Sequence, residues 1–297
     1  MNKAGFATIG LILLMIIRIL PLTAQEFTGE LKDKYEEKKA FKQEVYDKTL
    51  SFIRQNPNSP KLPDLYFNMG ELSIEIDVDN PAQTVSYFEK VIALQPDYER
   101  RDVVLYNIGY YSFMASLNER NDLRLQNLDQ VINWPESMRL SEQKLAKSIA
   151  AFQEIMDSYP DSEYYTESIY RLGTVYFELA LDARNPQEYY SRAIEYFDVV
   201  ANQTGDPLQH YGLFQRGWSN FSSGKFERAI EDFSRILEII ELDSLRTRRA
   251  FFEADAIENI AFSLIEYDGT DYDQASVAAA KAKEIFTTFV NDDYGKL

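Results

Sequence analysis

Apolar residues recur every three or four positions through most of this chain, with polar residues between them. Tyr189, Ala193 and Phe197 form one such series. This spacing places side chains on one face of a helix, whereas a strand would alternate apolar and polar residues. The pattern predicts an all-α protein, and 45% hydrophobic residues in 297 are enough for a continuous core.

Several of the predicted helices end in the same way, at a proline. Residues 52–57, 91–96 and 155–160 each run from apolar residues into a proline. Proline cannot continue a helix and restricts the residue before it, so the same structural event recurs along the chain. Such recurrence indicates tandem helical repeats.

Two units carry the repeat pattern most clearly, with a glycine in the first helix and alanine followed by phenylalanine in the second. The residues are, in order, Leu172, Gly173, Tyr176, Ala193 and Phe197 in one unit and Gly217, Ala229 and Phe233 in the next. We expect each glycine to leave room for the alanine of its partner helix. The phenylalanine would then fill the space between neighbouring pairs.

These residues resemble the signature of the tetratricopeptide repeat (TPR), and Gly70 and Gly109 stand in weaker copies of it. The resemblance covers nearly everything after residue 40. It implies a TPR-type right-handed α-solenoid of antiparallel helix pairs, with a leading helix within residues 25–60 and about five pairs within residues 61–297. The wide spacing between Gly109 and Phe152 predicts an insertion near residues 118–144.

Residues 148–176 look most like envelope members of the family, such as the outer-membrane assembly lipoprotein of the Bam complex and the periplasmic coordinator of the Tol-Pal system. The resemblance implies a non-catalytic scaffold or adaptor of the bacterial cell envelope, which binds a peptide or helix of another envelope protein in a concave groove. Exposed tyrosines of the first helices would line this groove, although packing between repeats would also explain most of them. The candidates are Tyr106, Tyr110, Tyr111, Tyr165 and Tyr170.

Trp134 lies in the expected insertion and has two interpretations. It anchors a partner, or it folds back onto the array with Val131 and Ile132. A flat platform of exposed aromatic residues around Trp134 would instead favour the alternative function, a glycan-binding component associated with the outer membrane.

The first 24 residues resemble a cleavable signal peptide. A basic Lys3 precedes an apolar run at residues 4–17, and Ala24 closes the segment. The run has 14 residues where a membrane-spanning helix needs about 20. A retained anchor would require Arg18 to reach the membrane interface. We therefore expect an exported protein of the periplasm or the outer-membrane periphery, with peripheral membrane association as a possibility.

Charge and composition exclude several functions. The formal net charge is -17, and the best basic cluster, Arg246, Arg248 and Arg249, is short, so nucleic acid is not an expected partner. The chain has no cysteine, which excludes disulfides, zinc-thiolate sites and lipidation at cysteine.

The candidate catalytic and metal-binding residues favour structural roles. His210 is the only histidine, so a catalytic triad or a zinc centre is not expected. The acidic stretches at residues 77–80 and 268–273 lack the spacing of a calcium loop and lie where helix caps are expected. No phosphate-binding glycine loop or nucleophile elbow occurs in the sequence. We predict no enzyme activity, metal or cofactor.

Overall fold

The computed structural model describes residues 29–126, 134–183, 185–242, 255–264 and 266. The described residues form helices and the turns between them, so the prediction of an all-α protein is confirmed. The helices are α2 (Gly29–Gln55), α3 (Leu62–Ile76), α4 (Pro81–Leu94), α5 (Arg101–Gln126), α6 (Trp134–Ser158), α7 (Tyr165–Asp182), α8 (Pro186–Ala201), α9 (Gln209–Ser222) and α10 (Phe226–Leu242). Residues 255–264 form a further helix. The predicted leader and most of the last predicted repeat lie outside the described residues.

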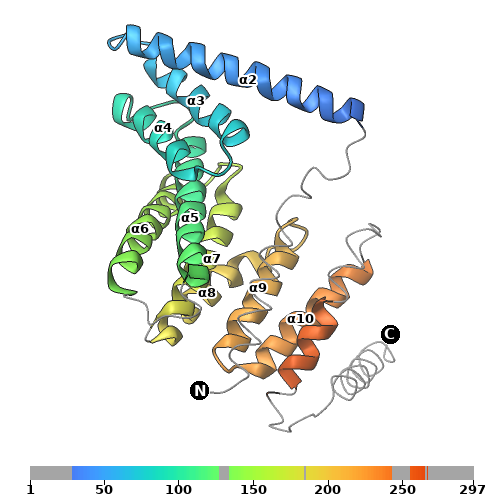
Figure 1. Cartoon of the computed structure of the whole chain (residues 1–297). Helices are drawn as coiled ribbons and strands as arrows, with labels where there is room; N and C mark the ends of the chain where they lie inside the picture. The colour runs from blue at the N-terminus through green and yellow to red at the C-terminus, as the bar shows by residue number, and fades with distance from the viewer. Residues whose placement is uncertain (1–28, 127–133, 184, 243–254, 265, 267–297) are drawn as a thin grey trace.

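Neighbouring helices pack in sequence order. The helices α3 and α4, α5 and α6, α7 and α8, and α9 and α10 form pairs, and the second helix of each of the first three pairs packs on the first helix of the next. Figure 1 shows these pairs following one another, with α2 crossing the end of the stack. The arrangement is an all-α repeat architecture.

Prolines and one asparagine set several helix boundaries. Helices α2, α4 and α6 each end two residues before a proline, at Pro57, Pro96 and Pro160. Pro81 and Pro186 are the first residues of α4 and α8, where a missing N–H costs nothing. The Asn80 side chain caps α4 by accepting a hydrogen bond from the Gln83 N–H at 3.2 Å.

Each helix pair is built around a glycine that lies against a phenylalanine ring. A Cβ atom added to the glycine would lie 2.6–2.8 Å from the nearest ring atom. The four contacts are Gly70 with Phe88, Gly109 with Phe152, Gly173 with Phe197 and Gly217 with Phe233. All four rings are fully buried. The helices of a pair approach closely because the glycine leaves space for the ring.

This contact corrects the expected pairing of glycine with alanine. The three atoms nearest to the added Cβ of Gly173, and likewise of Gly217, all belong to the phenylalanine ring. Ala193 and Ala229 are buried one helical turn before that ring. An aromatic residue three positions before each glycine meets the same phenylalanine, with ring centroids 5.7–6.0 Å apart. These residues are Phe67, Tyr106, Tyr170 and Phe214.

The irregular repeat spacing comes largely from longer helices. Helices α5 and α6 have 26 and 25 residues, and α7 has 18, whereas α9 has 14. Most of the expected insertion at residues 118–144 is therefore helix, because α5 continues to Gln126 and α6 begins at Trp134. Residues 127–133 of that stretch lie outside the described part.

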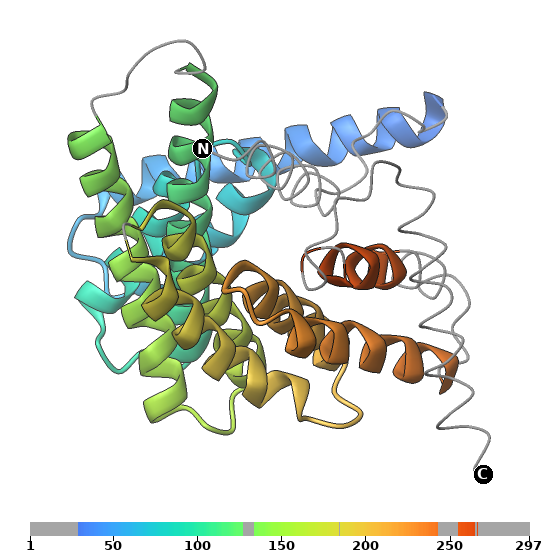
Figure 2. The same cartoon turned by 90° about the horizontal axis from the view of Figure 1, so that it is seen from below.

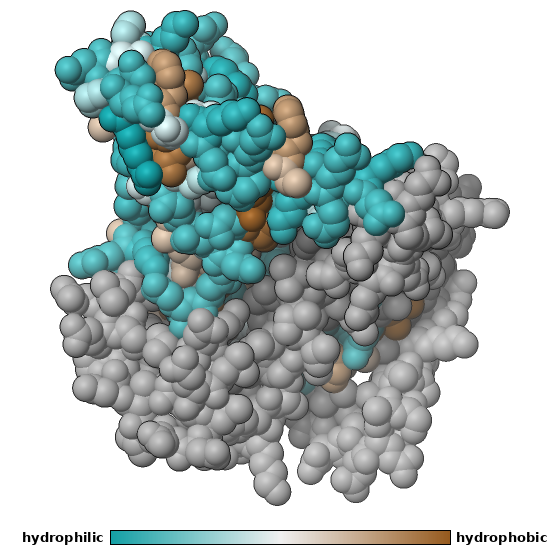
Figure 3. Space-filling view, turned by 45° about the horizontal axis from the view of Figure 1, so that its top comes forward, coloured by the Kyte–Doolittle hydropathy of each residue, from teal (hydrophilic) through white to brown (hydrophobic). Residues whose placement is uncertain are grey.

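The first helices of the pairs lie on the inner side of a curved array. Helix α5 contacts α7 directly, and α7 contacts α9 directly, in addition to the contacts within and between pairs. Figure 2 shows the pairs from α5 to α10 following a curved path. On the face shown in Figure 3, the described surface is mostly hydrophilic with small, separate apolar areas. Among the described helices, none has the length and apolar character needed to cross a membrane.

Candidate functional site

A continuous series of tyrosines and one arginine runs across the first helices α5, α7 and α9. We name this series the tyrosine ladder. Its members are Tyr164, Tyr106, Tyr110, Arg171, Tyr170 and Tyr211. Tyr164 belongs to the turn before α7, and the other members lie on the three helices.

Ring stacking and cation–π contacts join the members. The rings of Tyr106 and Tyr164 stack with centroids 4.4 Å apart, and those of Tyr106 and Tyr110 stack at 6.1 Å. The Arg171 guanidinium lies 4.9 Å from the centroid of the Tyr110 ring and 5.5 Å from that of Tyr170. Such stacking orients the rings and stabilises the contact beyond simple burial.

Glu167 connects two members of the ladder, Tyr106 on α5 and Arg171 on α7. Its Oε1 atom accepts hydrogen bonds from the Tyr106 hydroxyl at 2.6 Å and from Arg171 Nη2 at 2.8 Å. Burial raises the pKa of Tyr106, so its hydroxyl stays protonated and donates to the carboxylate. Burial alone would lower the pKa of Arg171, but Tyr106, Tyr170 and Glu167 together raise it and keep the guanidinium charged.

The ladder combines packing with a partly open surface. Tyr170 is 8% exposed, which contradicts its expected exposure. Tyr106, Tyr110 and Tyr165 are half-buried and pack against the core. Tyr170 is buried because its ring packs against Phe197, with centroids 5.8 Å apart, and belongs to the main hydrophobic core. Tyr106 and Tyr110 are only partly buried, so they keep some exposed area, and tyrosine is a stiff contact residue.

The sequence identified only part of this site. Tyr164, Arg171 and Tyr211 belong to the ladder but were not among the predicted binding residues. Arg171 follows directly on Tyr170, so proximity to a predicted tyrosine was the available signal. The predicted residue Tyr165 begins α7, packs against the core and has no ring contact with the described ladder residues.

The other candidate residues have structural positions or lie outside the described part. Trp134 begins α6, but its side chain is not among the described ones. Arg246, Arg248, Arg249 and residues 268–273 lie outside the described part of the chain. His210 is half-buried on α9, with its ring 4.2 Å from that of Tyr211. No group of residues suited to a metal ion occurs within the described ranges.

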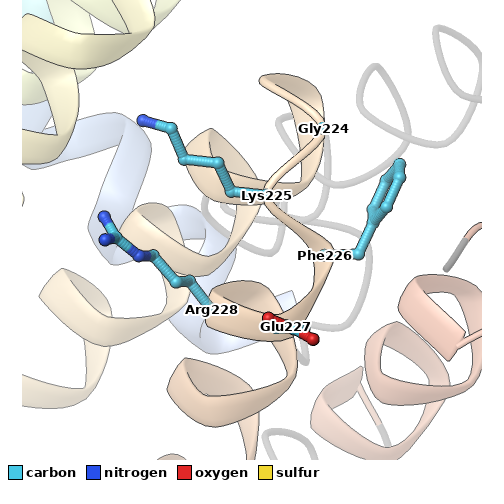
Figure 4. Close-up of a pocket in the computed structure, with 5 residues that line it drawn as sticks. All are labelled: Gly224, Lys225, Phe226, Glu227 and Arg228. Carbon is cyan, nitrogen blue, oxygen red and sulfur yellow. The ribbon is translucent and has the colours of Figure 1, made fainter.

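A surface depression of about 390 Å³ lies at the turn between α9 and α10. Its described lining comes from one short stretch, residues 224–228. Figure 4 shows Lys225 and Arg228 pointing to one side of this turn and Phe226 to the other. Because these side chains do not converge on one point, the depression is a weaker candidate than the ladder.

The fold and the ladder together define an all-helical protein of sequential helix pairs with tyrosines along its inner side. Neither a comparison with models of known protein families nor a comparison with curated proteins finds a match for this chain. The functional proposal therefore rests on the geometry.

Proposed function

We propose that this chain is a TPR-type, non-catalytic scaffold of the bacterial cell envelope that binds a peptide or helix of another envelope protein on its inner face. The proposal includes export to the periplasm or the outer-membrane periphery and the right-handed superhelical path of TPR arrays. The repeated contact between glycine and phenylalanine in four successive pairs supports the repeat assignment. The TPR-like residues and the leader of the sequence support the remainder.

The tyrosine ladder is the observation that carries the binding proposal. Tyrosine provides a large, rigid contact surface at low entropic cost, and the ladder extends across three successive first helices. Stacking and the Glu167 hydrogen bonds hold the rings in place before a partner arrives. Such preorganisation lowers the cost of binding.

Charge narrows the class of partner. The Arg171 cation is already neutralised by Glu167, with Nη2 and Oε1 2.8 Å apart. The chain as a whole carries a net charge of -17, so the field around the inner face favours a basic or neutral segment over an anionic one. The ladder therefore suits a partner that presents apolar and basic side chains.

Photo-cross-linking in the native envelope tests the proposal. A photoreactive phenylalanine analogue replaces Tyr110 in one sample and Val199, which is 46% exposed on the second helix α8, in a control sample. We expect the Tyr110 sample to capture one defined envelope protein that the Val199 sample does not. Capture of the same proteins from both positions, or retention of glycan alone, contradicts the proposal.

The captured protein is then purified and titrated calorimetrically against wild type, Tyr110→Ala and Tyr110→Phe. We expect Tyr110→Ala to weaken binding at least tenfold, or about 1.4 kcal/mol, and Tyr110→Phe to retain most of the affinity because the ring remains. Equal affinities of wild type and Tyr110→Ala, with both proteins folded by circular dichroism, would exclude the ladder as the binding surface.

A further inference from the structure

Helices α5, α7 and α9, which carry the tyrosine ladder, follow one another along the inner side of the array. Helix α5 contacts α7 directly, and α7 contacts α9 directly. Figure 1 shows the three in succession. The axes of helices in contact lie about 8–10 Å apart. A segment that crosses the three helices therefore meets the next one after each step of about that length.

Each of the three helices contributes a ladder side chain that keeps some exposed area. Tyr110 on α5 and Tyr211 on α9 are half-buried, and the Arg171 side chain on α7 is 26% exposed. The Arg171 guanidinium lies 4.9 Å from the centroid of the Tyr110 ring, and the rings of Tyr170 and Tyr211 are 6.4 Å apart. Because these contacts are continuous, the side chains form one track across the three helices.

The repeat length of a bound segment decides which conformation fits this track. A polyproline II helix presents the same face again after three residues, or about 9.3 Å, which matches the spacing of the helices. A β-strand repeats after two residues, or about 6.6 Å, and falls out of step. An α-helix returns after two turns, at about 10.8 Å, so a second property must separate it from polyproline II.

Hydrogen bonding at the centre of the ladder favours the extended segment. Arginine has several N–H donors and no acceptor, and Nε of Arg171 has no hydrogen-bond partner within the described ranges. The nearby Glu167 Oε1 atom already accepts bonds from Tyr106 and Arg171. A polyproline II segment has open carbonyl acceptors, whereas those of an α-helix are used internally. Proline also lacks the N–H that would need an acceptor here.

The tyrosine rings suit proline side chains. Aromatic surfaces recognise polyproline II segments, because the flat proline ring packs on them and the segment is already rigid. The Tyr110 ring is held by its neighbours, since it stacks on Tyr106 at 6.1 Å and meets Tyr111 edge to face at 5.1 Å. Two rigid surfaces that meet lose little entropy on binding.

Carboxylates surround the Tyr164 end of the ladder. Burial, and then three nearby carboxylates, raise the pKa of Tyr164, and one nearby guanidinium lowers it. The carboxylates belong to Glu163, Asp102 and Glu167, and the guanidinium belongs to Arg100. This local excess of negative charge has the same sign as the net charge of -17. Both favour a cation on the part of the segment that lies at this end.

We propose that the tyrosine ladder binds a proline-rich segment in the polyproline II conformation, with prolines at positions i, i+3 and i+6 and a basic residue beside them. The outer prolines would pack on Tyr110 and Tyr211, and a carbonyl between them would accept a hydrogen bond from Arg171. The basic residue would lie at the Tyr164 end. The proposal rests on the function proposed for the ladder and narrows its partner to one class of segment.

Fluorescence anisotropy with designed peptides tests the proposal on the full chain. The spaced peptide carries prolines at i, i+3 and i+6, alanines between them and lysine at both ends. The shuffled peptide has the same composition with prolines at i, i+2 and i+4, and the alanine peptide has alanine in place of each proline, which favours a helix. We expect the spaced peptide to bind at least tenfold more tightly than either, and glutamate in place of its lysines to weaken it at least tenfold.

Variants identify the surface that binds the spaced peptide. Tyr110→Ala should weaken its binding at least tenfold, and Tyr110→Phe should weaken it less than threefold, because the ring remains. The matched control is Tyr35→Ala, since Tyr35 is 51% exposed on α2 and lies outside the ladder. This control should change the affinity less than twofold. Circular dichroism verifies that each variant stays helical.

The outcomes separate this proposal from the function on which it rests. Equal affinities for the spaced and shuffled peptides, or no binding of the spaced peptide at about 1 mM, would overturn the proline-rich partner. Tighter binding of the alanine peptide, abolished by Tyr110→Ala, would also overturn it but would retain the ladder as the binding surface. Peptide binding that Tyr110→Ala and Tyr35→Ala weaken equally would exclude the ladder, and the function proposed for it would fail as well.

Discussion

The substitution Gly173→Ala tests whether the contact between glycine and phenylalanine determines the spacing of the helix pairs. The added Cβ would lie 2.6, 2.7 and 2.9 Å from three atoms of the Phe197 ring. Ordinary contacts between carbon atoms lie at about 3.5–4.0 Å. The ring has little room to move, because it is fully buried and lies 5.8 Å from the ring of Tyr170, centroid to centroid.

Two opposing terms set the expected magnitude. Alanine is favoured over glycine inside a helix by about 1 kcal/mol. Forcing a methyl group into a well-packed core costs about 1–3 kcal/mol, and the three short distances favour the upper end of that range. We therefore expect Gly173→Ala to lower the free energy of unfolding by about 2 kcal/mol, whereas at an open helical position the same change would raise it by about 1 kcal/mol.

Urea unfolding followed by circular dichroism measures this change, and a double-mutant cycle with Phe197→Leu identifies its cause. If the methyl group clashes with the ring, the double variant should be more stable than the sum of the two single losses predicts, by at least about 1 kcal/mol. A Gly173→Ala protein as stable as wild type or more stable, or a cycle without coupling, would refute the reasoning.

Three further predictions concern polar groups. Arg216→Leu should lower the free energy of unfolding by about 3–5 kcal/mol in urea titration, because the Asp232 side chain, 6% exposed, loses the cation that binds it at 2.5 Å; a loss below about 1 kcal/mol contradicts this. Tyr46→Phe should cost about 1–2 kcal/mol, because the Tyr87 hydroxyl loses its 2.6 Å hydrogen bond to Tyr46, and hydrogen exchange should accelerate in α2 while that of α9 stays unchanged. Burial and then a hydrogen bond to a carboxylate raise the pKa of Tyr98 to about 12 from 10.0, so its contribution to stability is fully present below pH 10 and is lost as the pH rises to about 12. Tyr98→Phe should therefore lose less stability than wild type over that interval in urea titrations, and parallel losses would contradict the assignment.

The helical class and the sequential order of the elements could be predicted because their causes are local. Apolar spacing and prolines act within a few residues, and α2, α4 and α6 end two residues before Pro57, Pro96 and Pro160. The atomic partner of each glycine could not be predicted in this way. Both Ala193 and Phe197 lie on the facing helix within one turn, and the approach of the two helices selects the ring.

The candidate site shows the same division. Tyr106, Tyr110 and Tyr170 could be proposed because tyrosines at helical spacing mark a helix face. The role of Glu167 could not, because it depends on a hydrogen bond to a residue 61 positions earlier in the chain. The burial of Tyr170 also differed from the expectation, since its ring packs against the buried ring of Phe197 on the facing helix.

By itself the sequence determined that this protein is built of helices, where several of them end, and that its charge is strongly negative. These properties follow from side-chain periodicity, backbone restriction by proline and composition, none of which requires knowledge of distant contacts. Only the tertiary structure decided which tyrosines join into a ladder and which half of α2 is exposed. Both depend on how helices far apart in sequence approach each other, and that geometry is set by the packing of whole faces.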